Sequence, residues 1–247
     1  MRYHTILFDA DGTLLDFKNA EETALKKTFA DHGFPFDEQT NHLYQQINHG
    51  LWGQFERGEI EKSVISTTRF TRLFQALGIA ADGVAFNTEY LYNLGDGSKV
   101  LPGAKELCAA LAPHCRLYIV TNGISKTQYR RLGGSVIQPY MSDIFVSEDT
   151  GSQKPLKAYF DYVFERIPGL DLKKTVIVGD SLTSDIQGGI NAGIDTCWYN
   201  PSHAENAEQI PVTWEIDDLL DFIEIAEGKR GRNLAASMQP QQPCMVE

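Results

Sequence analysis

The chain has 247 residues, of which 33 are acidic and 22 basic, so its formal net charge is −11, and 42% of its residues are hydrophobic. This length allows one large domain or two small ones with a sizeable core. The acidic charge disfavours binding to a nucleic acid polymer, and no apolar run is long enough to span a membrane.

The first predicted element is a strand over residues 4–8, followed directly by the turn Asp9-Ala10-Asp11-Gly12-Thr13. Asp9 and Asp11 interrupt the apolar run, so we expect no secretory signal. None of the four cysteines is part of a CxxC motif. Cys108 and Cys197 lie in apolar patterns that are typical of core positions. Both observations favour a reduced compartment, and we expect a cytoplasmic protein.

Residues 16–98 form a helical insertion in the predicted order of elements. Apolar residues recur there at intervals of three and four, and glycines separate the segments. The pattern predicts four helices, over residues 19–32, 37–48, 62–77 and 85–92.

From residue 99 onward, strand and helix signals alternate, which is typical of a βα-wound parallel sheet. A polar tail over residues 230–247, which contains Pro240 and Pro243, is predicted to be disordered. The predicted strands cover 116–121, 143–146, 174–178, 195–199 and 212–216, and the predicted helices cover 104–112, 125–132, 156–166, 183–192 and 217–226.

Acidic residues follow two of these strands. Asp9 and Asp11 come directly after the first strand, and Asp180 and Asp185 follow the strand at 174–178. The carboxyl ends of parallel strands meet at one edge of a sheet, where α/β folds bind ligands. Four ionised carboxylates repel one another unless a cation lies between them, and oxygen ligands of this kind suit Mg²⁺.

Two further strand ends carry groups that bind anions. Thr121-Asn122-Gly123 ends the strand at 116–121 and offers a hydroxyl, an amide and main-chain N–H groups. Lys154-Pro155 opens the next helix, where the helix dipole already favours an anion. These residues predict a phosphate site beside the acidic cluster.

The order Asp-x-Asp-Gly-Thr, Thr-Asn-Gly, Lys-Pro and Gly-Asp-x-x-x-x-Asp resembles the haloacid dehalogenase-like (HAD) hydrolase superfamily over nearly the whole chain. The resemblance implies an α/β fold, a Rossmann-like parallel sheet core with an inserted all-helical cap of the C1 type. The implied core comprises residues 1–15 and 99–229, and the implied cap comprises residues 16–98.

The resemblance also implies a role for each motif residue. Asp9 is the expected nucleophile, which takes the phosphoryl group as an aspartyl phosphate, and Asp11 is the expected general acid and base. Thr121, Asn122 and Lys154 are expected to bind phosphate. The expected Mg²⁺ ligands are Asp9, Asp180 and the main-chain carbonyl of Asp11, and Asp185 is expected to orient them or to pair with Lys154.

The cap is expected to act as a mobile lid that selects the leaving group. Candidate specificity residues are Phe17, beside the first motif, and Asn48 and Trp52, where an aromatic ring could stack on a base. For Trp52, packing inside the cap is the favoured alternative, because aromatic residues at helical spacing are usually buried.

Several segments further resemble the bacterial pyrimidine 5'-nucleotidase group. They are Leu-Leu-Asp-Phe, Gly-Leu-Trp, Ile-Val-Thr-Asn-Gly, Val-Ser-Glu-Asp-Thr-Gly, Gly-Gly-Ile-Asn-Ala-Gly and Thr-Cys-Trp. The implied substrate is a small phosphorylated metabolite, a pyrimidine nucleoside monophosphate, hydrolysed by a monomer or homodimer. A phosphatase or mutase for sugar phosphates or phosphoglycolate remains the alternative, because it would share every core residue and differ only in the cap.

Three other interpretations share parts of the pattern. A haloacid dehalogenase needs no acid at Asp11, so the Asp-x-Asp turn argues against it. A phospho-accepting receiver domain has its phosphorylated Asp after an internal strand and has no helical insertion. A noncatalytic binding protein on the same fold is disfavoured because every catalytic position is occupied.

Overall fold

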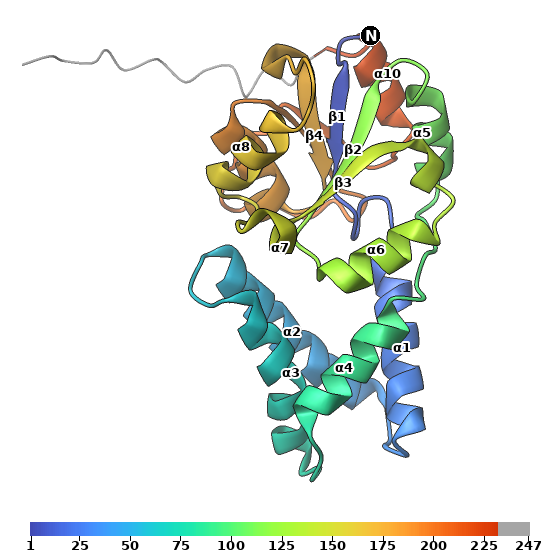
Figure 1. Cartoon of the computed structure of the whole chain (residues 1–247), viewed down its shortest axis with the longest axis vertical. Helices are drawn as coiled ribbons and strands as arrows, with labels where there is room; N and C mark the ends of the chain where they lie inside the picture. Colours follow the sequence, from blue (N-terminus) through green and yellow to red (C-terminus); the bar gives the residue numbers. More distant parts are fainter. Residues whose placement is uncertain (232–247) are drawn as a thin grey trace, which may run out of the picture.

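Six parallel strands form one sheet in the order β3-β2-β1-β4-β5-β6 in the computed structural model, which describes residues 1–231 (Figure 1). This arrangement confirms the predicted α/β fold with a parallel sheet. The tail predicted to be disordered lies, from residue 232 onward, outside the described residues. The strands are β1 (Thr5–Phe8), β2 (Arg116–Thr121), β3 (Met141–Val146), β4 (Thr175–Gly179), β5 (Asp195–Tyr199) and β6 (Trp214–Ile216).

Strand β1 lies in the middle of the sheet because every one of its side chains is apolar or small and buried. It pairs with β2 on one side and β4 on the other, and Phe8 is opposite both Ile119 and Val178. The residues that follow these three strands therefore meet at one edge of the sheet.

Helices cover both faces of the sheet. Helices α5, α6 and α10 pack on an apolar cluster that includes Phe8 and Phe222, and α8 and α9 pack on another that includes Phe160 and Ile177. Cys108 and Cys197 are buried in the first cluster, as their pattern predicted. These helices are α5 (Ala104–Leu111), α6 (Ser125–Gly133), α7 (Ser147–Thr150), α8 (Lys157–Glu165), α9 (Gln187–Ala192) and α10 (Asp221–Glu227).

The helix predicted over residues 183–192 is divided in two. A π-helical turn over Leu182–Ile186 precedes α9. Within that turn Asp185 is 1% exposed, and its carboxylate accepts hydrogen bonds from Ser181 N (3.1 Å) and from Lys154 Nζ (2.7 Å). The wider turn thus directs an acidic side chain back toward the sheet edge.

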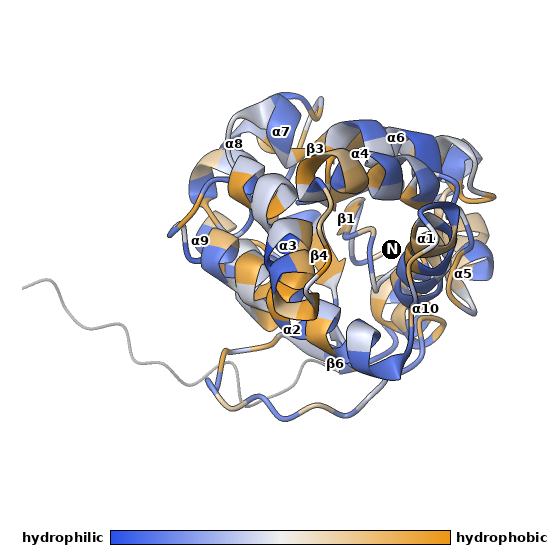
Figure 2. Ribbon diagram, turned by 90° about the horizontal axis from the view of Figure 1, so that it is seen from below, coloured by the Kyte–Doolittle hydropathy of each residue, from blue (hydrophilic) through white to orange (hydrophobic). Residues whose placement is uncertain are grey.

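The first four of the helices between β1 and β2 form the second layer of the molecule, below the sheet edge in Figure 1. They enclose an apolar cluster rich in aromatic rings, among them Phe29, Phe70, Phe74 and Phe86. Hydrophobic and hydrophilic residues alternate around these helices in Figure 2, as expected for amphipathic helices. They are α1 (Phe17–Asp31), α2 (Glu38–Glu56), α3 (Lys62–Leu77) and α4 (Gly83–Leu94).

Helix α2 is longer than predicted. The predicted helix ended at Asn48, before Gly50 and Gly53, but the observed helix continues to Glu56. Its last turns bury Leu51 and Phe55 against Ile65 of α3. The energy of this packing outweighs the helix-breaking tendency of two glycines.

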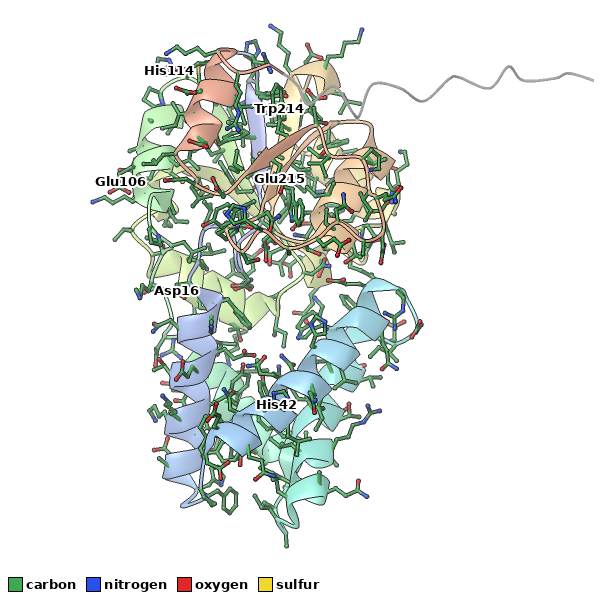
Figure 3. All side chains as sticks on the ribbon, turned by 180° about the vertical axis from the view of Figure 1, so that it is seen from behind. Asp16, His42, Glu106, His114, Trp214 and Glu215 are labelled. Carbon is green, nitrogen blue, oxygen red and sulfur yellow. The ribbon has the colours of Figure 1, made fainter. Side chains whose placement is uncertain are left out.

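Two chain segments connect the helical layer to the sheet, and they lie side by side. Leu15 forms an antiparallel bridge with Val100, and Asp16 N donates to Lys99 O at 2.9 Å. Figure 3 shows Asp16 at this junction. The exact division into core and cap at residues 15/16 and 98/99 stays a prediction. Among the described residues, none of the helices has the length and apolar character that crossing a membrane requires.

Candidate active site

The predicted nucleophile Asp9 lies beside the predicted phosphate-binding lysine. Lys154 Nζ donates to Asp9 Oδ1 at 2.5 Å, to Asp185 Oδ1 at 2.7 Å and to Val120 O at 2.8 Å. Lys154 is 1% exposed and Asp9 is 7% exposed. Three residues far apart in the sequence therefore form one buried ionic cluster at the edge of the sheet.

This cluster contains more negative than positive charge. Burial raises the pKa of Asp9 well above its ordinary value against the opposing effect of Lys154, and Asp185, Asp180 and Asp11 raise it further. Burial by itself lowers the pKa of Lys154, but the Asp185 and Asp9 carboxylates raise it above the ordinary value. The carboxylates thus hold the lysine fully charged and still repel one another.

Asp180 brings a third carboxylate to this group, and glycine makes room for it. Gly12 has a φ of +84°, and a Cβ there would lie 2.5 Å from Asp180 Oδ2. One oxygen from each of Asp9, Asp180 and Asp185 lies within 4.8 Å of the others. Asp180 as a whole residue is exposed. Desolvation of its carboxylate by the surrounding protein, together with the negative charge of Asp185, nevertheless raises the pKa of Asp180 to about 7. Clustered, mutually repelling oxygen donors of this kind fit a hard divalent cation.

Asp11 is held by two residues that the sequence reasoning did not identify. Gln128 Nε2 donates to Asp11 Oδ2 at 2.7 Å, and Arg131 Nη1 forms an ion pair with Asp11 Oδ1. Gln128 and Arg131 lie three residues apart on α6 and are each 1% exposed. The available signal was a polar pair at i and i+3 on a predicted helix that begins at the sheet edge.

Thr121 lies at the same edge with one hydrogen-bonding function left. Its hydroxyl oxygen accepts from Gly123 N at 3.1 Å and from Gln128 Nε2 at 2.8 Å. A hydroxyl has two acceptor sites and one donor, so its proton is left to donate to an anion. The Asn122 amide instead binds both main-chain groups of Lys154, each at 2.9 Å. The Asn122 side chain therefore positions Lys154 and is not free to bind a phosphate directly as predicted.

A cavity of about 560 Å³ extends from this cluster to the inserted helices. That volume suits a small organic ligand. The three predicted specificity residues, Phe17, Asn48 and Trp52, all line the cavity, and Asp9, Thr121 and Lys154 line its other end. Trp52 also packs on Phe55 of the cap, so both interpretations of this residue describe part of its environment.

The end of α2 and the start of α3 each contact the sheet edge. Lys62 Nζ donates to Gly123 O at 2.9 Å and to Ser147 Oγ at 2.6 Å. On the other side, Thr183 Oγ1 donates to Glu56 Oε2 at 2.8 Å. The helical layer is thus docked over the cavity by polar contacts on both sides.

Comparison with known proteins identifies the class of protein. The family model of haloacid dehalogenase-like hydrolases matches residues 3–193, and the chain belongs to this family of hydrolases. Membership in this family argues against the receiver-domain interpretation of the strand-end motifs.

Similar proteins support the assignment over most of the chain. The HAD-hydrolase YfnB of Bacillus subtilis is 47% identical over 91% of this chain and 95% of its own length. A magnesium-bound crystal structure of YfnB, which reveals interdomain movement, has a TM-score of 0.88 and covers 92% of this chain and 99% of that one at 46% identity. The pyrimidine 5'-nucleotidases PynA of Streptococcus pneumoniae and YjjG of Escherichia coli are 40% and 34% identical, over 91% and 90% of this chain and 96% and 97% of their own lengths.

Proposed function

We propose that this protein is a Mg²⁺-dependent phosphomonoesterase that hydrolyses pyrimidine nucleoside 5'-monophosphates through an aspartyl phosphate. The observation that carries the proposal is the contact between Lys154 Nζ and Asp9 Oδ1 at 2.5 Å, within the cluster of Asp180 and Asp185. This contact supports the proposal because a buried carboxylate, an ammonium group and further carboxylates then lie together at one end of the cavity.

In the first step, Asp9 attacks the phosphorus atom of the substrate, and the bond from phosphorus to the 5' oxygen breaks. Lys154 and the Thr121 hydroxyl stabilise the charge on the phosphoryl oxygens. Asp11 gives its proton to the departing 5' oxygen, so the nucleoside leaves as a neutral alcohol. Gln128 and Arg131 contact the two carboxyl oxygens of Asp11, so they orient this group and stabilise the carboxylate that the proton transfer leaves.

In the second step, Asp11 takes a proton from water while the water oxygen attacks the phosphorus of the aspartyl phosphate. The bond from phosphorus to Asp9 breaks, which restores the carboxylate and releases inorganic phosphate. Asp11 ends the cycle protonated and ready for the next substrate.

Asp9, Asp180 and the main-chain carbonyl of Asp11 would hold Mg²⁺. When bound, the ion supplies electrostatic attraction for the negatively charged phosphoryl group. Asp185 is occupied by Lys154 Nζ and Ser181 N, which suits a residue that orients the ligands. The magnesium bound in the structure of YfnB supports this choice of ion.

The names of PynA and YjjG support a nucleotide substrate, and the cavity has the volume and the aromatic lining for a base. The decisive experiment measures phosphate release from UMP, dUMP, dTMP, purine nucleotides, ribose 5-phosphate and phosphoglycolate, with Mg²⁺ or with EDTA. Asp9→Asn serves as the blank and should lose roughly 10⁴-fold or more in kcat.

Each outcome decides a different part of the proposal. Preference for UMP, dUMP or dTMP supports the nucleotidase. Preference for the sugar phosphate or phosphoglycolate would keep the chemistry and refute the substrate, in favour of the alternative from the sequence. Phosphate release that persists in Asp9→Asn or in EDTA would refute the mechanism itself.

A further inference from the structure

A buried arginine faces the cavity from the inserted helices. Arg69 of α3 is 2% exposed, and it lines the cavity that also contains Asp9 and Lys154. Its Nε donates to Asn87 Oδ1 at 2.7 Å and its Nη1 to Asn48 Oδ1 at 3.3 Å. Its Nη2 is buried and has no hydrogen-bond partner among the described residues.

The charge of Arg69 is only indirectly compensated. Asn48 lies between Arg69 and the buried carboxylate of Glu21, because its Nδ2 donates to Glu21 Oε1 at 3.2 Å. The guanidinium also lies over the ring of Tyr90, with Cζ 4.6 Å from the ring centre. Burying a charged group with a free donor is costly unless an acceptor completes its hydrogen bonds. The geometry therefore favours an acceptor atom on a molecule that enters the cavity.

A second buried polar atom on the same cavity has complementary character. Asn41 Oδ1 of α2 also has no partner among the described residues, and Asn41 lines the cavity with Arg69. The aromatic rings of Phe17 and Trp52 line it too. Together they provide a donor, an acceptor and flat apolar surface.

Uracil and thymine carry the matching groups, because each ring presents a carbonyl oxygen beside a ring N–H. We propose that Arg69 Nη2 donates to a carbonyl oxygen of the pyrimidine base and thereby determines substrate specificity, while Asn48 and Glu21 position the guanidinium. This inference rests on the proposed nucleotidase function. A guanidinium has donors and no acceptor, so Arg69 can contact only an acceptor atom of the base, and the ring N–H beside the carbonyl is left to donate to Asn41 Oδ1.

The test compares substrates with and without the base. We would measure kcat/KM for UMP and for 2-deoxyribose 5-phosphate in the wild type, Arg69→Gln and Arg69→Lys. Loss of one charged hydrogen bond should lower kcat/KM for UMP roughly 10- to 100-fold. The loss for 2-deoxyribose 5-phosphate should be at least about tenfold smaller, because that substrate has no base for Arg69 to contact. Arg72→Gln, on the exposed side of the same helix, is the matched control and should change neither value.

Equal losses on both substrates would mean that Arg69 supports the fold or the phosphate end, and no loss on UMP would mean that it contacts no base. Either result overturns the inference. If thermal melting shows that Arg69→Gln does not fold, Arg69→Lys decides, because it keeps the charge and lacks the second nitrogen. A wild type that hydrolyses UMP no faster than 2-deoxyribose 5-phosphate refutes the nucleotidase itself. A wild type that prefers UMP, with Arg69 variants that keep the preference, refutes only the role of Arg69.

Discussion

The two ends of the cavity treat a buried positive charge differently. At the sheet edge, Lys154 is surrounded by the carboxylates of Asp9 and Asp185 and by a main-chain carbonyl. In the inserted helices, Arg69 has two asparagine oxygens as partners and a third nitrogen without one among the described residues.

This difference separates a site that is assembled before substrate arrives from one that substrate completes. Paired charges at the sheet edge hold the reacting groups in place at no cost during the reaction. An arginine with a free donor gains most when the correct ligand binds, which is a source of selectivity. The proposed function and the proposed role of Arg69 would then place chemistry at the sheet edge and specificity in the inserted helices.

The largest effects are expected when either of these two buried cations is removed. Lys154→Met leaves two buried carboxylates without their counter-charge and should cost about 3–5 kcal/mol of unfolding free energy, together with turnover. Arg69→Met leaves only neutral asparagine oxygens unpaired and should cost about 1–3 kcal/mol. Urea unfolding of both variants measures the difference, and equal costs would show that the two sites are built alike.

Lys62 is an intermediate case, because its side chain is only 11% exposed and its Nζ lies 3.9 Å from the Glu148 carboxylate. Burial lowers the pKa of Lys62 to about 8, although Glu148 and Asp149 oppose the change. Between about pH 8 and the ordinary lysine value of 10.5, the folded form binds fewer protons than the unfolded chain, so stability rises with pH. Over the whole window this amounts to up to about 3 kcal/mol.

The measurement is the difference in unfolding free energy between the wild type and Lys62→Met, taken at about pH 7.5 and again at about pH 10. The wild type should gain on the variant as pH rises. Lys173→Met, at an exposed lysine, is the control and should show a constant difference. A constant difference for Lys62→Met as well would show that its amine is not desolvated in the folded protein.

Arg131 tests how far the reacting groups depend on their supports. Arg131→Met removes the ion pair with Asp11 and should lower kcat roughly 10- to 100-fold, because the acid is less well positioned. Arg130→Met is the neighbouring control, since Arg130 contacts Asp96 and Tyr92 and not Asp11. Steady-state kinetics on one nucleotide compare them, and similar kcat values for the two variants would contradict the assigned role.

The smallest effect is expected at the docking contact between the two layers. Thr183→Val removes the hydrogen bond to Glu56 and should lower kcat/KM by less than about tenfold, the value of one partly exposed hydrogen bond. Thr67→Val is the control, because that hydroxyl bonds only within its own helix. A loss as large as that of Arg131→Met would assign this contact a catalytic role.

Much of the core was predictable because its signals are local. A buried strand such as residues 5–8 can be recognised from its side chains, and an acidic turn after it shows where the strand ends. Parallel pairing then brings Asp9, Thr121 and Asp180 to one edge whatever the lengths of the connections. The extension of α2 beyond Asn48 was not predictable in this way, since it depends on contacts of Leu51 and Phe55 with another helix.

Periodicity and neighbouring residues are sufficient to predict the parallel sheet, the helical insertion and the strand-end groups that face one edge. The pairing of Arg131 with Asp11, 120 positions away, and the position of Arg69 on the same cavity as Asp9 depend instead on how the elements pack. Both arginines lie on amphipathic helices, where the sequence pattern predicts that a charged side chain is exposed to solvent. Arg131 is buried where α6 packs near the sheet edge, and Arg69 is buried where α3 packs on α2 and α4. The partner of a buried charge therefore depends on position in space rather than along the chain.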